Sequence, residues 1–125
     1  MQSFLYKPET FKIIVHCMKV QSILGFGFSE IVYKDAMEIE FIQDRLYHER
    51  EPKLTITYKG QILKSLFSPD FTCFEKIILE VKASENGLSM NHIAQILNYL
   101  KISGYKVGLL INFGRHKLEY KRIVR

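Results

Sequence analysis

The segment that decides the fold of this chain runs from Ser68 to Ala83 and reads SPDFTCFEKIILEVKA. Its second half alternates like a strand, because positions 78, 80 and 82 face one side and positions 77, 79, 81 and 83 the other. Glu80 and Lys82 therefore project together, while the opposite side is wholly apolar. Two ionisable groups on one face of a packed strand are costly unless something pairs with them, and a divalent cation is a natural partner.

A second carboxylate is predicted to join this pair. Pro69 interrupts the preceding strand, Asp70 begins the next one, and a turn at residues 74–76 could bring Asp70 close to Glu80. Carboxylates are hard oxygen ligands that suit Mg²⁺ or Mn²⁺ better than zinc, and Lys82 could orient or deprotonate a bound water. Taken alone, Glu80 and Lys82 are more typical of a solvated strand face, so the rest of the sequence has to decide.

The composition is that of one globular domain spanning residues 1–125. Of these residues 47% are hydrophobic and 25% are charged, which suits a single core. No stretch is apolar enough to span a bilayer, and Lys7, Pro8 and Glu9 interrupt the start of the chain, where a secretory signal needs an apolar run. Cys17 and Cys73 are far apart, which predicts two reduced thiols. We therefore expect a cytoplasmic protein with no membrane partner.

The charge balance favours contact with polyanions. Eighteen Lys and Arg residues against thirteen Asp and Glu residues give a net charge of +5. Basic residues gather at 115–117 and 121–125, whereas Glu38, Glu40 and Asp44 make an earlier stretch acidic. A basic edge beside an acidic metal site would suit a phosphate-backbone ligand.

Apolar periodicity and turn residues predict the remaining elements. In chain order these are helices at about 8–22 and 30–44, strands at 54–58, 62–67, 70–73 and 77–83, a helix ending near 104, and strands at 107–113 and 118–124. The order is therefore ααββββαββ. A helix crossing between the strands 77–83 and 107–113 would make them parallel by a right-handed connection. The predicted fold is α/β, with a mixed β-sheet flanked by helices.

Apolar stripes on the helices predict which faces are buried. The predicted core positions are Phe11, Ile14, Val15 and Met18 on the first helix, Val32, Ala36 and Ile39 on the second, and Ile93, Ile96, Leu97 and Leu100 on the third.

Two further sets of polar residues could belong to the same site. Glu30, with Tyr33 one turn later, begins the second helix and could add a third carboxylate. By itself a glutamate in a first turn is more typical of a helix-dipole contact, and a tyrosine there of the core. Gln95 and Tyr99 share a stripe of the later helix, with His92 a turn before, and could grip a phosphate or order a water. Alone, they would be typical of a helix boundary.

Read together, these motifs resemble the PD-(D/E)XK nuclease superfamily. The motifs are Pro69-Asp70, Glu80-Val81-Lys82 and a trailing QxxxY motif at 95–99. Within the superfamily, the segment GFSEIVY at 27–33 is similar to the signature of the GxxExxY family of small bacterial and archaeal proteins. Further similarity at 12–14, 58–60 and 108–114 extends the resemblance from about Lys12 to the C-terminus.

The chain departs from that family pattern at two places. Val20-Gln21 stands where the family usually has Val-His, and Gly25-Phe26-Gly27 where it usually has Gly-Pro-Gly. The residues that match the three core catalytic positions of the superfamily, Asp70, Glu80 and Lys82, are all present.

The resemblance implies a restriction-endonuclease-like core with a divalent-metal site. The implied roles are metal binding by Asp70, Glu80 and Glu30, catalytic assistance by Lys82, and accessory positions at Gln95, Tyr99 and Tyr33. The implied activity is that of a Mg²⁺- or Mn²⁺-dependent nuclease that hydrolyses phosphodiester bonds in DNA or RNA by a metal-activated water. Of the two nucleic acids, we expect DNA to be the partner. The alternative is a nucleic-acid-binding or assembly module that keeps the fold with little or no catalysis. A homodimer formed through an exposed final strand could supply a recognition surface.

Overall fold

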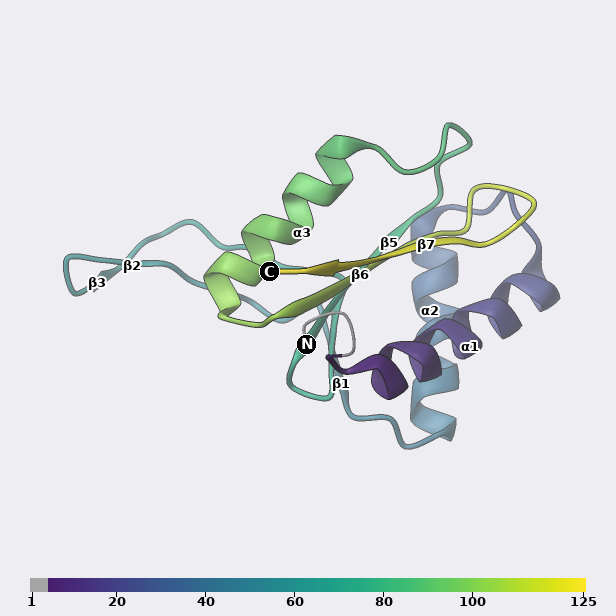
Figure 1. Ribbon diagram of the computed structural model, residues 1–125, viewed down its shortest axis with the longest axis horizontal. Coiled ribbons are helices and arrows are strands. Elements are labelled where there is room, and N and C mark those ends of the chain that lie inside the picture. Colours follow the sequence, from purple (N-terminus) through teal and green to yellow (C-terminus); the bar gives the residue numbers. More distant parts are fainter. Residues whose placement is uncertain (1–4) are drawn as a thin grey trace.

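The structure is a computed structural model that describes residues 5–125. Its elements are α1 (Lys7–Leu24), α2 (Glu30–Gln43), β1 (His48–Arg50), β2 (Thr57–Tyr58), β3 (Gln61–Ile62), β4 (Phe71–Cys73), β5 (Ile77–Lys82), α3 (Met90–Ser103), β6 (Val107–Asn112) and β7 (Glu119–Val124) (Figure 1). The predicted mixed α/β architecture is confirmed, with one strand, β1, that the predicted order ααββββαββ lacks. No helix within residues 5–125 is long and apolar enough to cross a membrane.

A five-stranded sheet with the order β1-β4-β5-β6-β7 forms the centre of the fold. β5 and β6 are parallel, as the helical crossover predicts, and the other neighbouring strands are antiparallel. Figure 1 shows α3 on one side of this sheet and the α1–α2 pair on the other. Side chains alternate along β5, so that Leu79 and Val81 pack with α1 and α2, while Ile78 packs under α3. Glu80 and Lys82 share the face of Ile78.

The β4–β5 hairpin has the predicted turn and register. Phe71 pairs with Leu79, and Cys73 pairs with Ile77. Phe74 and Glu75 in the turn adopt left-handed conformations, with φ of 58° and 57°. This register places residue 70 across from residue 80, which is the arrangement that the sequence predicts for the two carboxylates.

The buried faces of α1 and α2 differ from the predicted stripes. On α1, Phe11 is 67% exposed and Val15 and Met18 are also exposed, whereas Ile13 and Cys17 are fully buried. On α2, Ile39 is exposed, and the buried side chains are Tyr33, Lys34, Met37 and Phe41. Both helices carry apolar residues on two adjacent stripes, so hydrophobicity alone does not select the face that meets the sheet.

The predicted strands at 54–58 and 62–67 form a separate arm. Only β2 and β3 pair as strands, and a single bridge joins Leu54 to Phe67 at the base of the arm. Figure 1 shows the arm projecting away from the main sheet. Its turn, Lys59-Gly60, has φ of 49° and 77°, which is typical of a type I′ hairpin. The pairing is shorter than predicted because the exposed side chains of Tyr58 and Ile62 have no core to pack against.

Gly108 on β6 marks a close approach of α3 to the sheet. A Cβ atom at this position would lie 2.4 Å from Ile96 Cγ2, and Ile96 is fully buried. Gly108→Ala is therefore expected to lower the free energy of unfolding by about 1–3 kcal/mol, because the helix or its side chain must shift. Urea denaturation measures this change. In an Ile96→Ala background the cost should fall, and an equal cost in both backgrounds would contradict the close approach.

Candidate functional site

Two carboxylates meet at the open end of the β4–β5 hairpin. Asp70 Oδ2 accepts a hydrogen bond from Val81 N–H at 2.7 Å, and Glu80 Oε1 accepts one from Asp70 N–H at 2.8 Å. Each carboxylate is thus held by the backbone of the opposite strand. Pro69, which is buried, fixes the backbone just before Asp70, where the strand pairing begins. The hairpin therefore brings Asp70 and Glu80 side by side.

Glu80 lies in an environment that disfavours its negative charge. The residue is only 3% exposed, and burial together with the charge of Asp70 raises the pKa of Glu80 to about 8. The hydrogen bond from Asp70 N–H and the charges of Lys82 and Lys34 oppose this rise without cancelling it. Glu80 therefore holds a proton at neutral pH until more positive charge enters the site. The electrostatics favour a cation beside it.

A chain of polar contacts links Lys82 on β5 to helix α3. Lys82 Nζ lies 3.8 Å from Glu80 Oε2 and donates to Gln95 Oε1 at 3.2 Å. Gln95 Nε2 in turn donates to the hydroxyl of Tyr99 at 3.3 Å, and that hydroxyl donates to the Ser68 carbonyl oxygen at 3.4 Å. Burial, followed by the charges of Glu80 and Asp70, raises the pKa of Tyr99. Of the α3 residues predicted as accessory, Gln95 thus contacts Lys82 directly and Tyr99 is linked to it through Gln95.

Lys34 on α2 is a site residue that sequence reasoning missed. Its side chain is 9% exposed, and its Nζ lies 2.8 Å from Asp70 Oδ1 and 2.7 Å from Glu51 Oε1. Burial lowers the pKa of Lys34, but its bonds to Asp70 and Glu51 and their charges outweigh this, so the pKa lies above its ordinary value. The available signal was a lysine between Tyr33 and Met37, on a stripe of α2 that is otherwise apolar.

Glu30 is not brought to the carboxylate pair. It is exposed at the start of α2, and its charge acts on His92, whose pKa is lowered by burial and by Lys82 and raised in part by Glu30. Within residues 5–125, no group of three His, Cys, Asp or Glu side chains could share a metal ion. The predicted three-carboxylate set of Asp70, Glu80 and Glu30 is therefore reduced to a pair, with Glu30 at the rim near His92.

Tyr33 belongs to the core between the sheet and the α1–α2 pair. It is fully buried, its ring stacks on Phe113 at 4.5 Å between centroids, and its hydroxyl donates to the Gly25 carbonyl oxygen at 2.7 Å. Phe113 N–H donates to the carbonyl oxygen of Lys82 at 2.8 Å. Tyr33 therefore supports the backbone next to Lys82 instead of joining the polar cluster that sequence reasoning predicted.

The donor set at this hairpin fits a hard divalent cation. Asp70 and Glu80 present oxygen ligands only, and the pKa of Glu80 is raised first by burial and then by the charge of Asp70, which the surrounding lysines offset only in part. Two protein carboxylates are a usual complement for Mg²⁺, which keeps several waters or phosphate oxygens as its other ligands. Lys34, bound to Asp70 Oδ1, is the group that a cation would compete with for that oxygen.

Comparisons with known proteins bear on this arrangement. A family model described as the PD-(D/E)XK nuclease superfamily matches residues 7–123. Among solved structures, the crystal structure of SSO0001 is similar, with a TM-score of 0.58 and 20% sequence identity. The match covers 96% of this chain and 60% of that one, so the chain spans about three fifths of its length. At this identity the likeness shows the fold alone. A search of curated proteins finds no match.

Proposed function

The chain belongs to the PD-(D/E)XK nuclease superfamily, and on that premise we propose that it is a divalent-metal-dependent nuclease whose active site is built on Asp70, Glu80 and Lys82. One observation carries the proposal. The β4–β5 hairpin holds two carboxylates side by side, each accepting a hydrogen bond from a backbone N–H of the opposite strand, and the Lys82 ammonium lies 3.8 Å from Glu80. Such a cluster on one face of a sheet matches the needs of phosphodiester hydrolysis, namely a cation site and a proton-handling group.

The proposed roles follow from the contacts of each residue. Asp70 and Glu80 would hold the ion, which in such sites neutralises phosphate charge and lowers the pKa of a bound water. Lys82 donates hydrogen bonds toward the attacking water or a phosphate oxygen, and Gln95 Oε1 fixes its direction. Tyr99, tethered to the Ser68 carbonyl, keeps Gln95 in place. Most of the rate would come from this positioning and from electrostatics.

Purified protein incubated with fluorescent single- and double-stranded DNA and RNA, with Mg²⁺ or Mn²⁺, tests the proposal. Asp70→Ala and Lys82→Ala are expected to lower the cleavage rate at least about 100-fold, because each removes several kcal/mol of transition-state stabilisation. Glu85→Ala, which removes an exposed carboxylate from the loop after β5, should cleave at the wild-type rate. Cleavage that survives Asp70→Ala would come from a contaminant and would remove the assignment.

A nucleic-acid-binding module with little catalysis is the second candidate. The observation that favours it is Lys34, whose own ammonium neutralises Asp70. Salt-dependent binding of unchanged nucleic acid, with no Mn²⁺ bound in calorimetry, would support this function. Calorimetric Mn²⁺ binding that is lost in Asp70→Ala would count against it.

Narrower assignments also belong to the proposal. From the motif at 27–33 we propose that the chain is a member of the GxxExxY family. We also propose that the protein is cytoplasmic and that its substrate is DNA and not RNA. A homodimer would use β7, which forms one edge of the five-stranded sheet. Gel filtration that gives a clean monomer would remove the dimer, and the four nucleic-acid substrates of the cleavage assay decide between DNA and RNA.

A further inference from the structure

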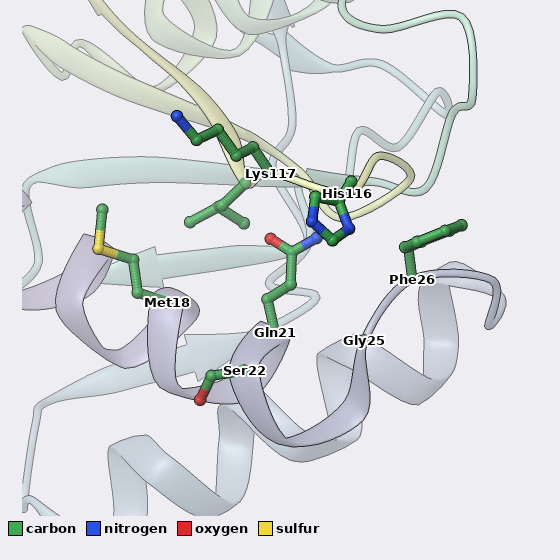
Figure 2. Close-up of a pocket in the computed structure, with 8 residues that line it drawn as sticks. Met18, Gln21, Ser22, Gly25, Phe26, His116 and Lys117 are labelled. Carbon is green, nitrogen blue, oxygen red and sulfur yellow. The ribbon is translucent and has the colours of Figure 1, made fainter.

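A pocket lies between the C-terminal half of α1 and the loop that joins β6 to β7. Its volume is about 690 Å³, within the range of sites that hold small organic ligands. Figure 2 shows Gln21 on its floor, with Phe26 and His116 beside each other on one side and Lys117 above. None of these four residues belongs to the group formed by Asp70, Glu80 and Lys82, which we call the carboxylate cluster. The pocket is therefore a second concave site.

Two aromatic rings stand at the side of this pocket. The rings of Phe26 and His116 lie 6.2 Å apart between centroids and are nearly perpendicular, at 83°. Phe26 is 56% exposed, on a turn in which Gly25 and Gly27 adopt φ of 70° and 111°. The glycines on both sides of Phe26 thus adopt backbone conformations that favour glycine, and the turn they form places the apolar ring of Phe26 in solvent. Exposed aromatic faces of this kind are the surfaces on which unpaired bases stack.

The loop that carries His116 is also basic. Arg115 pairs with Glu119 and donates to the Glu85 carbonyl oxygen. Lys117 is exposed and makes no ion pair with any side chain in the described part of the chain. Lys117 follows His116 directly in the chain, so the loop combines an ammonium that attracts phosphate with a ring that can stack on a base, the usual pair of features for binding single-stranded nucleic acid.

The pocket floor carries an acceptor without a partner. Gln21 Nε2 donates to the carbonyl oxygens of Arg115, at 2.6 Å, and Phe113, at 3.4 Å, which fixes the orientation of the amide. Gln21 is 8% exposed, and its Oε1 makes no hydrogen bond with any described residue. Buried acceptors are normally satisfied. Gln21 therefore ties α1 to the loop that carries Arg115, and its buried oxygen is not a contact on the pocket surface.

Chain connections join the pocket to the carboxylate cluster. Phe113 N–H donates to the Lys82 carbonyl oxygen, and the loop with His116 and Lys117 begins directly after Phe113. On the other side, Phe26 precedes Glu30, whose charge reaches His92 near Lys82. The pocket and Lys82 therefore lie at the same end of the sheet, where the parallel strands β5 and β6 finish.

From these features we infer that the pocket binds an unpaired base of a single-stranded nucleic acid, with Phe26 and His116 as its stacking surface and Lys117 on the adjoining phosphate. The inference rests on the proposed nuclease function and names its substrate as single-stranded. A duplex keeps its bases stacked on each other and offers the pocket only its backbone, whereas an unpaired base can leave the strand and enter. Unpaired nucleotides of DNA and RNA share this chemistry.

Fluorescence anisotropy in EDTA and low salt tests the inference, because no cleavage can occur. The probes are labelled 12-residue strands of thymidine DNA and uridine RNA, a blunt duplex, and an abasic strand of equal length. Phe26→Ala is expected to weaken binding of the strands with bases by about 5- to 100-fold. The same substitution should leave the abasic strand unaffected, whereas Lys117→Ala should weaken all single strands alike.

Phe11→Ala is the matched control, since Phe11 is likewise an exposed phenylalanine but lies on α1 and does not line the pocket. It should bind as the wild type does, and Phe26→Tyr should keep most of the affinity. Equal effects of Phe26→Ala and Phe11→Ala, an equal loss on the abasic strand, or duplex binding as tight as single-strand binding would each overturn the inference. Intact binding in EDTA without cleavage in Mg²⁺ would remove the nuclease function and leave the base pocket standing.

Discussion

Glu80→Gln is expected to abolish metal-dependent cleavage and, at the same time, to stabilise the metal-free protein. Glu80 is almost fully buried, and its pKa in the folded protein is about 8. The folded state therefore keeps a proton that the unfolded chain loses at lower pH. The stability that comes from the protonated carboxyl is complete below the ordinary glutamate pKa and is lost as the pH rises through 8.

Glutamine does not titrate, so the advantage of Glu80→Gln should grow between about pH 4.5 and pH 8. At pH 8 we expect a gain of roughly 2–4 kcal/mol in the free energy of unfolding, measured by urea denaturation in EDTA. The amide oxygen introduced by the substitution can still accept the bond from Asp70 N–H that Glu80 Oε1 accepts. The cleavage rate should fall at least about 100-fold, because one of two ion ligands is neutralised.

Glu85→Gln serves as the control, since Glu85 is exposed in the loop after β5. Its stability should follow that of the wild type at every pH. A stability difference for Glu80→Gln that stays constant from pH 5 to pH 8 would mean that Glu80 does not hold a proton in the folded protein. Burial of Glu80 would then give no electrostatic reason to expect a cation at this position.

Lys34→Met is expected to destabilise the metal-free protein by about 2–4 kcal/mol. The substitution keeps the apolar stem but removes the ammonium that contacts Asp70 Oδ1 and Glu51 Oε1. Breaking a buried ion pair leaves an uncompensated charge, and here the cost is moderated because the Asp70 side chain is 16% exposed. Thermal unfolding in EDTA measures the loss.

Added Mg²⁺ should then show whether Lys34 only stabilises the fold or also occupies the place of the ion beside Asp70. If Lys34 and the ion compete for Asp70, saturating Mg²⁺ will raise the Tm of Lys34→Met by more than it raises that of the wild type. Lys19→Met is the matched control, because Lys19 is 58% exposed and its ion pair with Glu40 measures 3.5 Å. We expect that variant to lose less than about 1 kcal/mol. If Mg²⁺ raised the Tm of the wild type, Lys34→Met and Lys19→Met by the same amount, Lys34 and the ion would not be competing for Asp70.

The strands around the carboxylates could be predicted from sequence because their signals are local. The alternation of Ile77–Lys82, the turn before it and the continuous apolar run of β6 each specify one conformation. The helix faces could not be predicted in the same way. On α1, the stripe with Phe11 and Met18 is as apolar as the stripe with Ile13 and Cys17, and only the position of the sheet decides between them. When a helix is apolar on two sides, its packing against the rest of the fold decides which side is buried.

In the candidate site, too, local sequence predicts some of the contacts, and tertiary packing decides the others. Asp70 and Glu80 are brought together by a hairpin of known turn length, so their proximity follows from local pairing. Lys34 reaches Asp70 from α2, 36 positions earlier in the chain, and no local pattern links the two residues. Glu30 was expected at the carboxylates because it begins the second helix and is the glutamate of the motif at 27–33, but it lies one turn before Lys34, which makes the contact with Asp70, and it stays exposed.

The parallel pairing of β5 with β6 determines when the carboxylate hairpin becomes part of a complete sheet. Asp70, Glu80 and Lys82 have all been made once the ribosome has passed residue 82, yet β5 then has only the three-residue strand β4 beside it. Six further rungs, from Ile77–Val107 to Lys82–Asn112, become available only after α3 has been made and has crossed the sheet. Closing such a non-local pairing is a late and slow step of folding. A nascent or truncated chain that stops before α3 can bring Asp70 and Glu80 together in the hairpin, but it lacks the β6 rungs and the contact of Lys82 with Gln95, so the full set of contacts forms only when the sheet has assembled around β5.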